Sequence, residues 1–359
     1  MTSRSMRPWV ALLPGLLLGA VLGACSTDAG DDATGSPNAS SAPTAVDSQA
    51  IPDDVTIEPG TPATDPRQAL ALIPADAGEV TLTDFRQLRE RLGYPRLTSE
   101  SLMTDRNAFW ERVRTETPAL TQGLLRDQAS RLWLDYGFGQ DDVAWEARFD
   151  TPDGAGYVVS FRRGQEMAAV RRAVADRATG LRGATVMAKE RLLVRHIAGE
   201  GDAVLASVPG LADLLDKDAE ASYLRTDCVP FAEALGDDAT VEDQESLLSK
   251  VDIRYLRPLT AWAVNFDSQV LTARLTPESD EQPERADLHQ RADLMEVWPE
   301  TGPIDWPDGF RGLTVADPMT GRIGAQVRNP VAAANLVLAG RVPFAVCNEA
   351  TPMAEPTGL

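Results

Sequence analysis

Few residues of this chain are of the types that carry out catalysis or bind metals. Among its 359 residues only His196 and His289 are histidines, and a long stretch of chain separates them. Zinc and copper sites need clustered histidine and cysteine ligands, so the sequence predicts no such metal centre. The sequence also lacks a serine-nucleophile elbow, a metalloprotease helix and a phosphate-cradling glycine loop. We therefore predict no catalytic residue, no metal and no cofactor.

Carboxylates are the one reactive group present in excess, with 54 aspartates and glutamates. Two carboxylates at a suitable separation are enough for glycoside hydrolysis. Acidic residues cover any surface this acidic, however, and the sequence singles out no pair. The formal net charge of −20 argues against nucleic acid or anionic lipid as a general partner, because their negative charges would be repelled.

Arginines gather in one stretch of this acidic chain. Residues 160–195 contain nine basic and three acidic residues. Guanidinium groups suit phosphate and carboxylate ligands. One interpretation is a patch for an anionic ligand or an acidic partner, formed by Arg162, Arg163, Arg171 and Arg172. The alternative is a solvated helix face whose charges pair with the acidic second half of the chain.

Two tryptophans lie close together in a segment rich in proline and glycine. They occur in Val297-Trp298-Pro299 and Asp305-Trp306-Pro307. Exposed indoles in such a segment would form a stacking or protein-contact surface. The alternative is that both rings cover the edge of the core.

The first 25 residues have the order of a secretory signal. Arg4 and Arg7 precede an apolar run from Trp9 to Val21, and Leu22-Gly23-Ala24-Cys25 follows. The run is too short to span a bilayer, which takes about 20 residues. Residues 22–25 resemble the lipobox of bacterial lipoproteins. This resemblance implies that residues 1–24 are a signal peptide and that Cys25 carries a diacylglycerol. The alternative is an ordinary cleaved signal with a chance cysteine.

The resemblance also implies where the mature protein resides and what it contacts. An N-terminal lipid would hold it on the cell membrane, facing outside the cytoplasm. The scarcity of lysine relative to arginine indicates a high-GC, actinobacterial genome. The whole layout is similar to that of secreted actinobacterial envelope lipoproteins, as are short stretches such as Leu72–Ala77 and Ala203–Ser207. That similarity implies no particular activity.

Two cysteines remain beyond the predicted anchor, Cys228 and Cys347. Outside the cytoplasm an isolated pair most simply forms a disulfide. Two buried free thiols are the alternative.

Composition divides the chain into four segments. They are the signal at 1–24, the lipidated cysteine and an acidic tether at 25–66, an ectodomain at 67–348 and a flexible tail at 349–359. The tether contains eight acidic residues and neither lysine nor arginine, so it has too little apolar surface to fold. The ectodomain is long enough for two lobes, at about 67–220 and 221–348.

Turn signals within the ectodomain separate short alternating segments. Strand pairs are predicted at 143–149 with 157–161, within 184–197, at 261–266 with 270–275 and at 313–315 with 323–327. Helices are predicted at 83–92, 117–137, 165–179 and 329–340. Hairpins followed by helices predict an α+β fold, with antiparallel sheets and helices packed on them. Because both halves contain strand, turn, strand and helix, the lobes could be similar.

These observations favour a non-enzymatic binding or protein-interaction module, displayed on the membrane and acting on an envelope protein or a small ligand. A solute- or lipid-capturing receptor with a cleft between two lobes is the first alternative. A carboxylate-based envelope hydrolase is the second.

Overall fold

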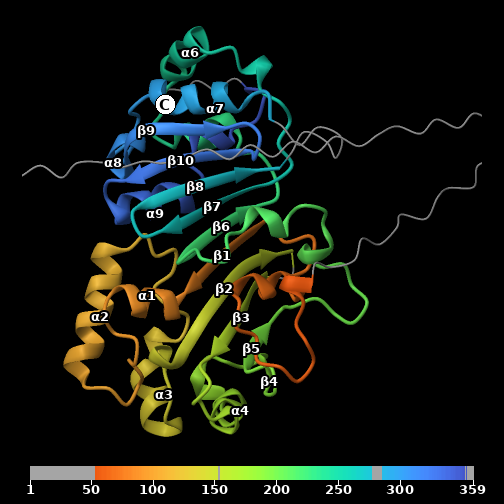
Figure 1. The fold of residues 1–359 in the computed structure, drawn as a ribbon, viewed down its shortest axis with the longest axis vertical. Coiled ribbons are helices and arrows are strands. Elements are labelled where there is room, and N and C mark those ends of the chain that lie inside the picture. Colours follow the sequence, from red (N-terminus) through yellow and green to blue (C-terminus); the bar gives the residue numbers. More distant parts are fainter. Residues whose placement is uncertain (1–52, 153, 277–284, 352, 354–359) are drawn as a thin grey trace, which may run out of the picture. The chain divides into compact units, whose positions relative to one another are not determined.

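The computed structural model describes residues 53–152, 154–276, 285–351 and 353. The predicted α+β fold is confirmed within these residues, where one antiparallel sheet of ten strands carries the helices (Figure 1). The predicted signal peptide, Cys25 and the tether up to residue 52 lie outside the described residues.

The strands cross the sheet in the order β4-β5-β3-β2-β1-β6-β7-β8-β10-β9, which Figure 1 shows from bottom to top. Their bounds are β1 Glu79–Asp84, β2 Val143–Thr151, β3 Gly154–Phe161, β4 Thr185–Met187, β5 Leu192–Arg195, β6 Ala221–Arg225, β7 Trp262–Asp267, β8 Val270–Leu275, β9 Phe310–Asp317 and β10 Arg322–Val327. The four predicted hairpins are confirmed as the pairs β2–β3, β4–β5, β7–β8 and β9–β10.

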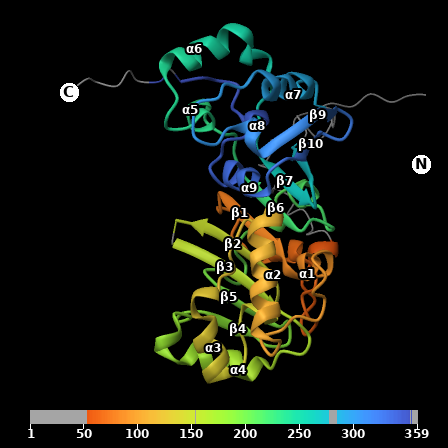
Figure 2. The same ribbon diagram turned by 90° about the vertical axis from the view of Figure 1, so that its left-hand side faces the viewer.

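The helices of both halves pack on the same face of the sheet (Figure 2). Side chains alternate between the two faces of a strand, and the register places Tyr157, Tyr223 and Val264 on one face. Tyr157 belongs to the core beneath the first-half helices, and Tyr223 and Val264 to the core beneath the second-half helices. The helices are α1 Phe85–Arg91, α2 Met103–Glu116, α3 Ala129–Tyr136, α4 Met167–Ala175, α5 Phe231–Leu235, α6 Val241–Lys250, α7 Leu288–Val297, α8 Trp306–Gly309 and α9 Pro330–Leu338.

The two halves repeat one topology. From the centre outward the first half has the strand order β1-β2-β3-β5-β4, and the second half has β6-β7-β8-β10-β9. In each half helices follow the first strand, and α4 or α7 follows the central hairpin. The first strands, β1 and β6, pair antiparallel in the middle of the sheet. The second copy of the repeat thus begins with β6, at residue 221. One continuous sheet joins the two copies.

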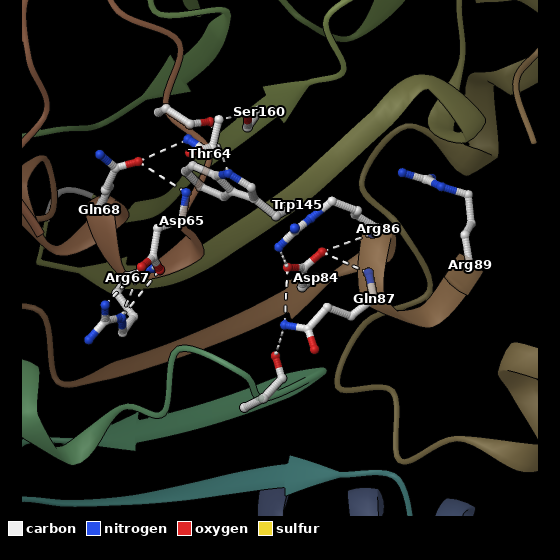
Figure 3. A network of polar contacts seen from close by, with 12 residues as sticks. Thr64, Asp65, Arg67, Gln68, Asp84, Arg86, Gln87, Arg89, Trp145 and Ser160 are labelled. Carbon is white, nitrogen blue, oxygen red and sulfur yellow. Dashed lines mark hydrogen bonds and ion pairs between the residues drawn. The ribbon is translucent and has the colours of Figure 1, made fainter. Parts of the chain in front are cut away.

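The opposite face of the first half is covered by the segment before β1, which corrects the predicted start of the fold at Arg67. Val55 and Ala63 are buried in a core with strand residues such as Val80. The Ala63 carbonyl accepts hydrogen bonds from Trp145 Nε1 at 3.2 Å and Ser160 Oγ at 2.9 Å, within the contacts drawn in Figure 3. The fold therefore includes residues 53–66, because a few small apolar side chains and backbone acceptors fit this face.

The disulfide between Cys228 and Cys347 is confirmed. It ties the end of β6 to the C-terminal segment. The predicted flexible tail is corrected in part, because its first residues contact α6. Gln244 donates to the Thr351 carbonyl at 3.1 Å and accepts from the Met353 amide at 3.0 Å.

The single helix predicted at 117–137 is wrong. Helix α2 ends before Thr117, whose backbone is extended at φ −128° and ψ 146°. A proline at the next position disfavours the helical conformation in the residue before it. Pro118 therefore ends a helix where the sequence predicted a start. Gly137 ends α3 in the left-handed region at φ 78°, as predicted.

The charged segment at 285–296 contains the most deeply buried ion pairs of the described residues. Arg285 and Arg291 both contact the Asp287 carboxylate, and all three side chains are buried. Arg291 also donates to the carbonyls of Phe344 and Val346 at 2.8 and 2.9 Å. The cluster holds α7 against the C-terminal segment.

Candidate functional site

Two of the four arginines of the predicted anionic-ligand patch, Arg162 and Arg163, follow β3, and the other two, Arg171 and Arg172, lie in α4. Arg163, Arg171 and Arg172 are exposed, and Arg162 donates to the Leu97 carbonyl at 2.7 Å. None of the four forms an ion pair with another described residue. Arg162 and Arg172 border a groove of about 350 Å³. Carboxylates of Asp142, Glu100 and Glu166 line the same groove, so it offers both signs of charge.

The two tryptophans expected at a partner contact are core residues, which corrects that expectation. Trp298 and Trp306 are 8% and 7% exposed. Trp298 packs against Phe231, and Trp306 stacks on Phe310 with 4.1 Å between ring centroids. Their apolar rings fill the space between the second-half helices and the sheet. Neither ring is available to a partner in this structure.

A cavity that the sequence did not indicate lies on the helix-bearing face, where the two halves of the sheet meet. Its volume is about 380 Å³. The residues that line it come from five strands, from the segment between α2 and α3 and from the end of α9. We name it the central cavity. Its lining residues are Glu79, Thr81, Leu120, Leu124, Arg148, Phe149, Asp150, Ala155, Gly156, Tyr157, Arg195, Tyr223 and Leu338.

The floor of the central cavity is one row of side chains across adjacent strands. The register pairs Arg195 with Tyr157, Tyr157 with Arg148, Arg148 with Thr81 and Thr81 with Tyr223. Residues paired in this way share a face of the sheet. The row therefore places one guanidinium group on each side of Tyr157. The second tyrosine, Tyr223, lies further along the row.

Neither tyrosine hydroxyl of this row makes a hydrogen bond of normal geometry with a described residue, and both hydroxyl oxygens have almost no exposed surface. Glu79 and Arg225 nevertheless lie close to the Tyr223 hydroxyl. Tyr157 is 7% exposed and Tyr223 is 1% exposed. Burial raises the pKa of Tyr157, which the charge of Arg195 opposes. Burial and the nearby Glu79 carboxylate also raise the pKa of Tyr223. Both hydroxyls therefore stay protonated at neutral pH and can donate a hydrogen bond. A buried hydroxyl without a partner is costly, and most buried polar groups in proteins are satisfied.

Some charged side chains around the central cavity form ion pairs, and others do not. Glu79 lies 3.5 Å from Arg225, whose guanidinium also contacts Glu233 at 2.5 Å. The guanidinium groups of Arg148 and Arg195 make neither an ion pair nor a hydrogen bond with any described residue. Asp150 is an exposed carboxylate at the rim. The floor row therefore presents two cations that are free to contact a ligand.

The segment between α2 and α3 supplies an apolar wall through Leu120 and Leu124. The buried carboxylate of Glu146 fixes this segment. It accepts hydrogen bonds from Thr121 Oγ1 at 2.6 Å, from the Leu124 amide at 3.1 Å and from Gln140 Nε2 at 3.0 Å. Leu338, at the end of α9, adds an apolar side chain from the second half. The cavity thus combines a cationic floor with an aliphatic wall.

The side chains that line the central cavity provide cationic, carboxylate, hydroxyl and apolar groups. The buried carboxylates Asp141 and Asp142, at the start of β2, are engaged elsewhere by Arg106, Trp110 and backbone amides. Among the described residues no group of three or more histidine, cysteine, aspartate or glutamate side chains is arranged to hold a metal ion.

No family model, curated protein or solved structure matches this chain. None of the helices within the described residues is long and apolar enough to cross a membrane.

Proposed function

We propose that this protein is a lipid-anchored binding protein of the cell envelope that captures a small solute in the central cavity. The lipobox resemblance at residues 22–25 supports the anchor and the location outside the cytoplasm. The cavity supports the binding role, because its volume of about 380 Å³ lies in the range usual for small-molecule sites.

The observation that carries the binding role is the pair of unpartnered hydroxyls on Tyr157 and Tyr223. A fold that needed these rings only for packing would be better served by phenylalanine, because a buried hydroxyl without a partner destabilises the protein. The hydroxyl oxygens have almost no exposed surface, so a ligand that accepts from them would enter with a movement of the rings and would then remove that cost. Their presence beside a cavity favours a receptor over a purely structural domain.

Native mass spectrometry of the protein purified from its own membranes tests the binding role. We expect a bound small molecule on the wild type that is absent from a Tyr157→Phe, Tyr223→Phe double variant. The proposal would be contradicted if the purified protein carried no bound compound and if no compound of a solute screen raised its thermal stability.

Fractionation of cells tests the anchor. Cys25→Ser should release the folded domain from the membrane fraction, because the thiol that carries the lipid is gone. The far-ultraviolet circular dichroism of the released protein should equal that of the wild type. A variant that stays wholly in the membrane fraction would disprove the anchor.

A protein-interaction module is the second candidate, and one exposed cluster favours it. Leu102, Met103, Trp133 and Leu134 are large apolar residues that are 71%, 58%, 40% and 71% exposed. The last three line a cavity of about 360 Å³ between α2 and α3. Crosslinking from a photoreactive residue at position 130, which lines the same cavity and is exposed, should then capture an envelope protein, and an added Leu134→Ser change should abolish the product.

A further inference from the structure

We infer that the ligand of the central cavity is an amphiphilic anion, with a carboxylate or phosphate head and a hydrocarbon part. This inference rests on the proposed function and specifies its ligand. Three observations lead to it: the free cations of the floor row, the buried hydroxyls and the aliphatic wall.

The cations decide the sign of the ligand's charge. Arg148 and Arg195 lie on the two strands that flank Tyr157, so their Cα atoms are about 10 Å apart by the usual strand spacing. Arginine side chains can converge from that separation on one head group above the Tyr157 ring. Because no described carboxylate engages either guanidinium, an acidic head would be their first counter-charge.

The acids of the same cavity do not compete with such a head. Glu79 has Arg225 as its cation, and Arg225 is held in turn by Glu233. Asp150 and Arg148 are both exposed, so water screens both of these charges. A cationic ligand would therefore meet two unpaired arginines and only one unpaired carboxylate.

The hydroxyls add geometry to the charge. A protonated phenol donates one hydrogen bond, and a carboxylate or phosphate accepts several. Tyr157 lies between the two arginines, and its hydroxyl, which has almost no exposed surface here, can join them on the same head once the ring moves toward the cavity. Tyr223 lies further along the row, where it is 1% exposed and close to Glu79 and Arg225, so it supports the end of the cavity and does not contact the head directly.

The apolar wall of the central cavity indicates that the rest of the ligand is hydrocarbon. Leu120 and Leu124 face the cavity from the segment that Glu146 holds, and Leu338 lines it from α9 while remaining 41% exposed. Covering these side chains with hydrocarbon removes apolar surface from water and favours binding. An inorganic anion would use the floor row alone.

Isothermal titration calorimetry of the mature Cys25→Ser protein with four probes tests the inference. The probes are decanoate, decyl phosphate, decanol and inorganic phosphate, all below the concentration at which they form micelles. We expect decanoate or decyl phosphate to bind at least tenfold more tightly than decanol and inorganic phosphate. The preferred head of the first two distinguishes a carboxylate ligand from a phosphate ligand.

Variants locate the interaction. Arg148→Gln with Arg195→Gln should weaken binding of the preferred anion at least tenfold, whereas Arg311→Gln with Arg322→Gln, exposed on β9 and β10 of the second half, should leave it unchanged. Leu338→Asn, which removes the apolar side chain without adding a charge, should weaken decanoate binding but not the weak binding of inorganic phosphate. All five positions are at least partly exposed, so these changes spare the core.

The outcomes separate the two proposals. Equal affinity for decanol and decanoate, or an unchanged affinity in the Arg148, Arg195 double variant, overturns the anionic class while leaving a receptor. A neutral or cationic compound found on the protein from its own membranes has the same meaning. Binding of none of the four probes, together with no bound compound, overturns the inference and the proposed function alike.

Discussion

The hydroxyls of Tyr157 and Tyr223 make a prediction about stability in the absence of ligand. Each is a buried donor without a partner among the described residues. Replacing either tyrosine with phenylalanine removes the unsatisfied group and keeps the ring. We expect each variant to gain up to about 1 kcal/mol in the free energy of unfolding, measured by urea denaturation of protein freed of bound compounds.

Tyr136→Phe is the matched control for these two variants. The Tyr136 hydroxyl donates to the Asp176 carboxylate at 2.5 Å, so its removal should destabilise the protein. Loss of stability in the Tyr157 and Tyr223 variants as well would show that their hydroxyls are satisfied in solution.

The surroundings of Asp287 predict how the stability of the protein depends on pH. Burial alone would raise its pKa, but hydrogen bonds and charge from Arg285 and Arg291 outweigh burial and hold the pKa below the ordinary value of 3.8. A lowered folded-state pKa contributes stability above the unfolded value, and this contribution is lost as the pH falls through the folded value. Part of the acid sensitivity below about pH 4 should therefore come from Asp287.

Asp287→Asn should remove that part of the pH dependence and leave two buried guanidiniums without a counter-charge. Breaking a buried ion pair in this way costs about 3–5 kcal/mol. Asp252→Asn, in an exposed pair with Arg254, should change little. Unfolding curves between pH 3 and pH 7 measure both effects, and parallel pH dependence of wild type and Asp287→Asn would refute the assignment.

At the scale of elements, the disulfide joins the segment after β6 to the segment after α9 across 119 positions. Closing a loop of this length restricts the unfolded chain by an amount worth about 4–5 kcal/mol in the entropic model. Cys228→Ser with Cys347→Ser should lower the unfolding midpoint accordingly. The neighbouring backbone bonds between Val229 and Ala345 and between Cys347 and Val229 should keep the native arrangement. A midpoint that is the same with and without reductant would contradict this.

The elements differ in how well the sequence predicted them. The hairpins were predictable because Pro152–Gly154 and Pro318–Gly321 are strong turn signals between alternating segments. Helix α2 was missed, since only Phe109, Trp110 and Val113 of its 14 residues are buried. A pattern of three apolar residues among charged ones gives almost no helical periodicity.

The central strands and the cavity above them were also beyond local patterns. Strands β1 and β6 have six and five residues, and too few positions alternate to indicate a strand. The floor row joins residues from Thr81 to Tyr223 through four strand pairings. Register between distant strands decides which side chains meet, and sequence spacing does not contain it.

At the scale of the whole molecule, pairing of β1 with β6 joins the two copies of the repeated topology. Each copy alone would expose the edge of its first strand, and Leu224 and Ala263 of the second copy would lose the core they share with Val80 and Leu82 of the first. The central cavity would also be divided, because its lining includes Tyr223 and Leu338 from the second copy. We therefore expect the copies to depend on one another for both stability and binding.

Two fragments, residues 53–220 and 221–353, test this dependence. Each should aggregate or remain partly unfolded when expressed alone, because an unpaired central strand is a template for wrong pairing. Coexpressed fragments should associate one to one and recover the circular dichroism spectrum of the intact chain. A Leu82→Lys change, which places a charge in the shared core, should prevent recovery, whereas Arg171→Gln on α4 should not. If the first fragment folds alone with the thermal stability of the intact protein, the two copies are independent. The pairing of β1 with β6 would then not be needed for the fold of the first copy.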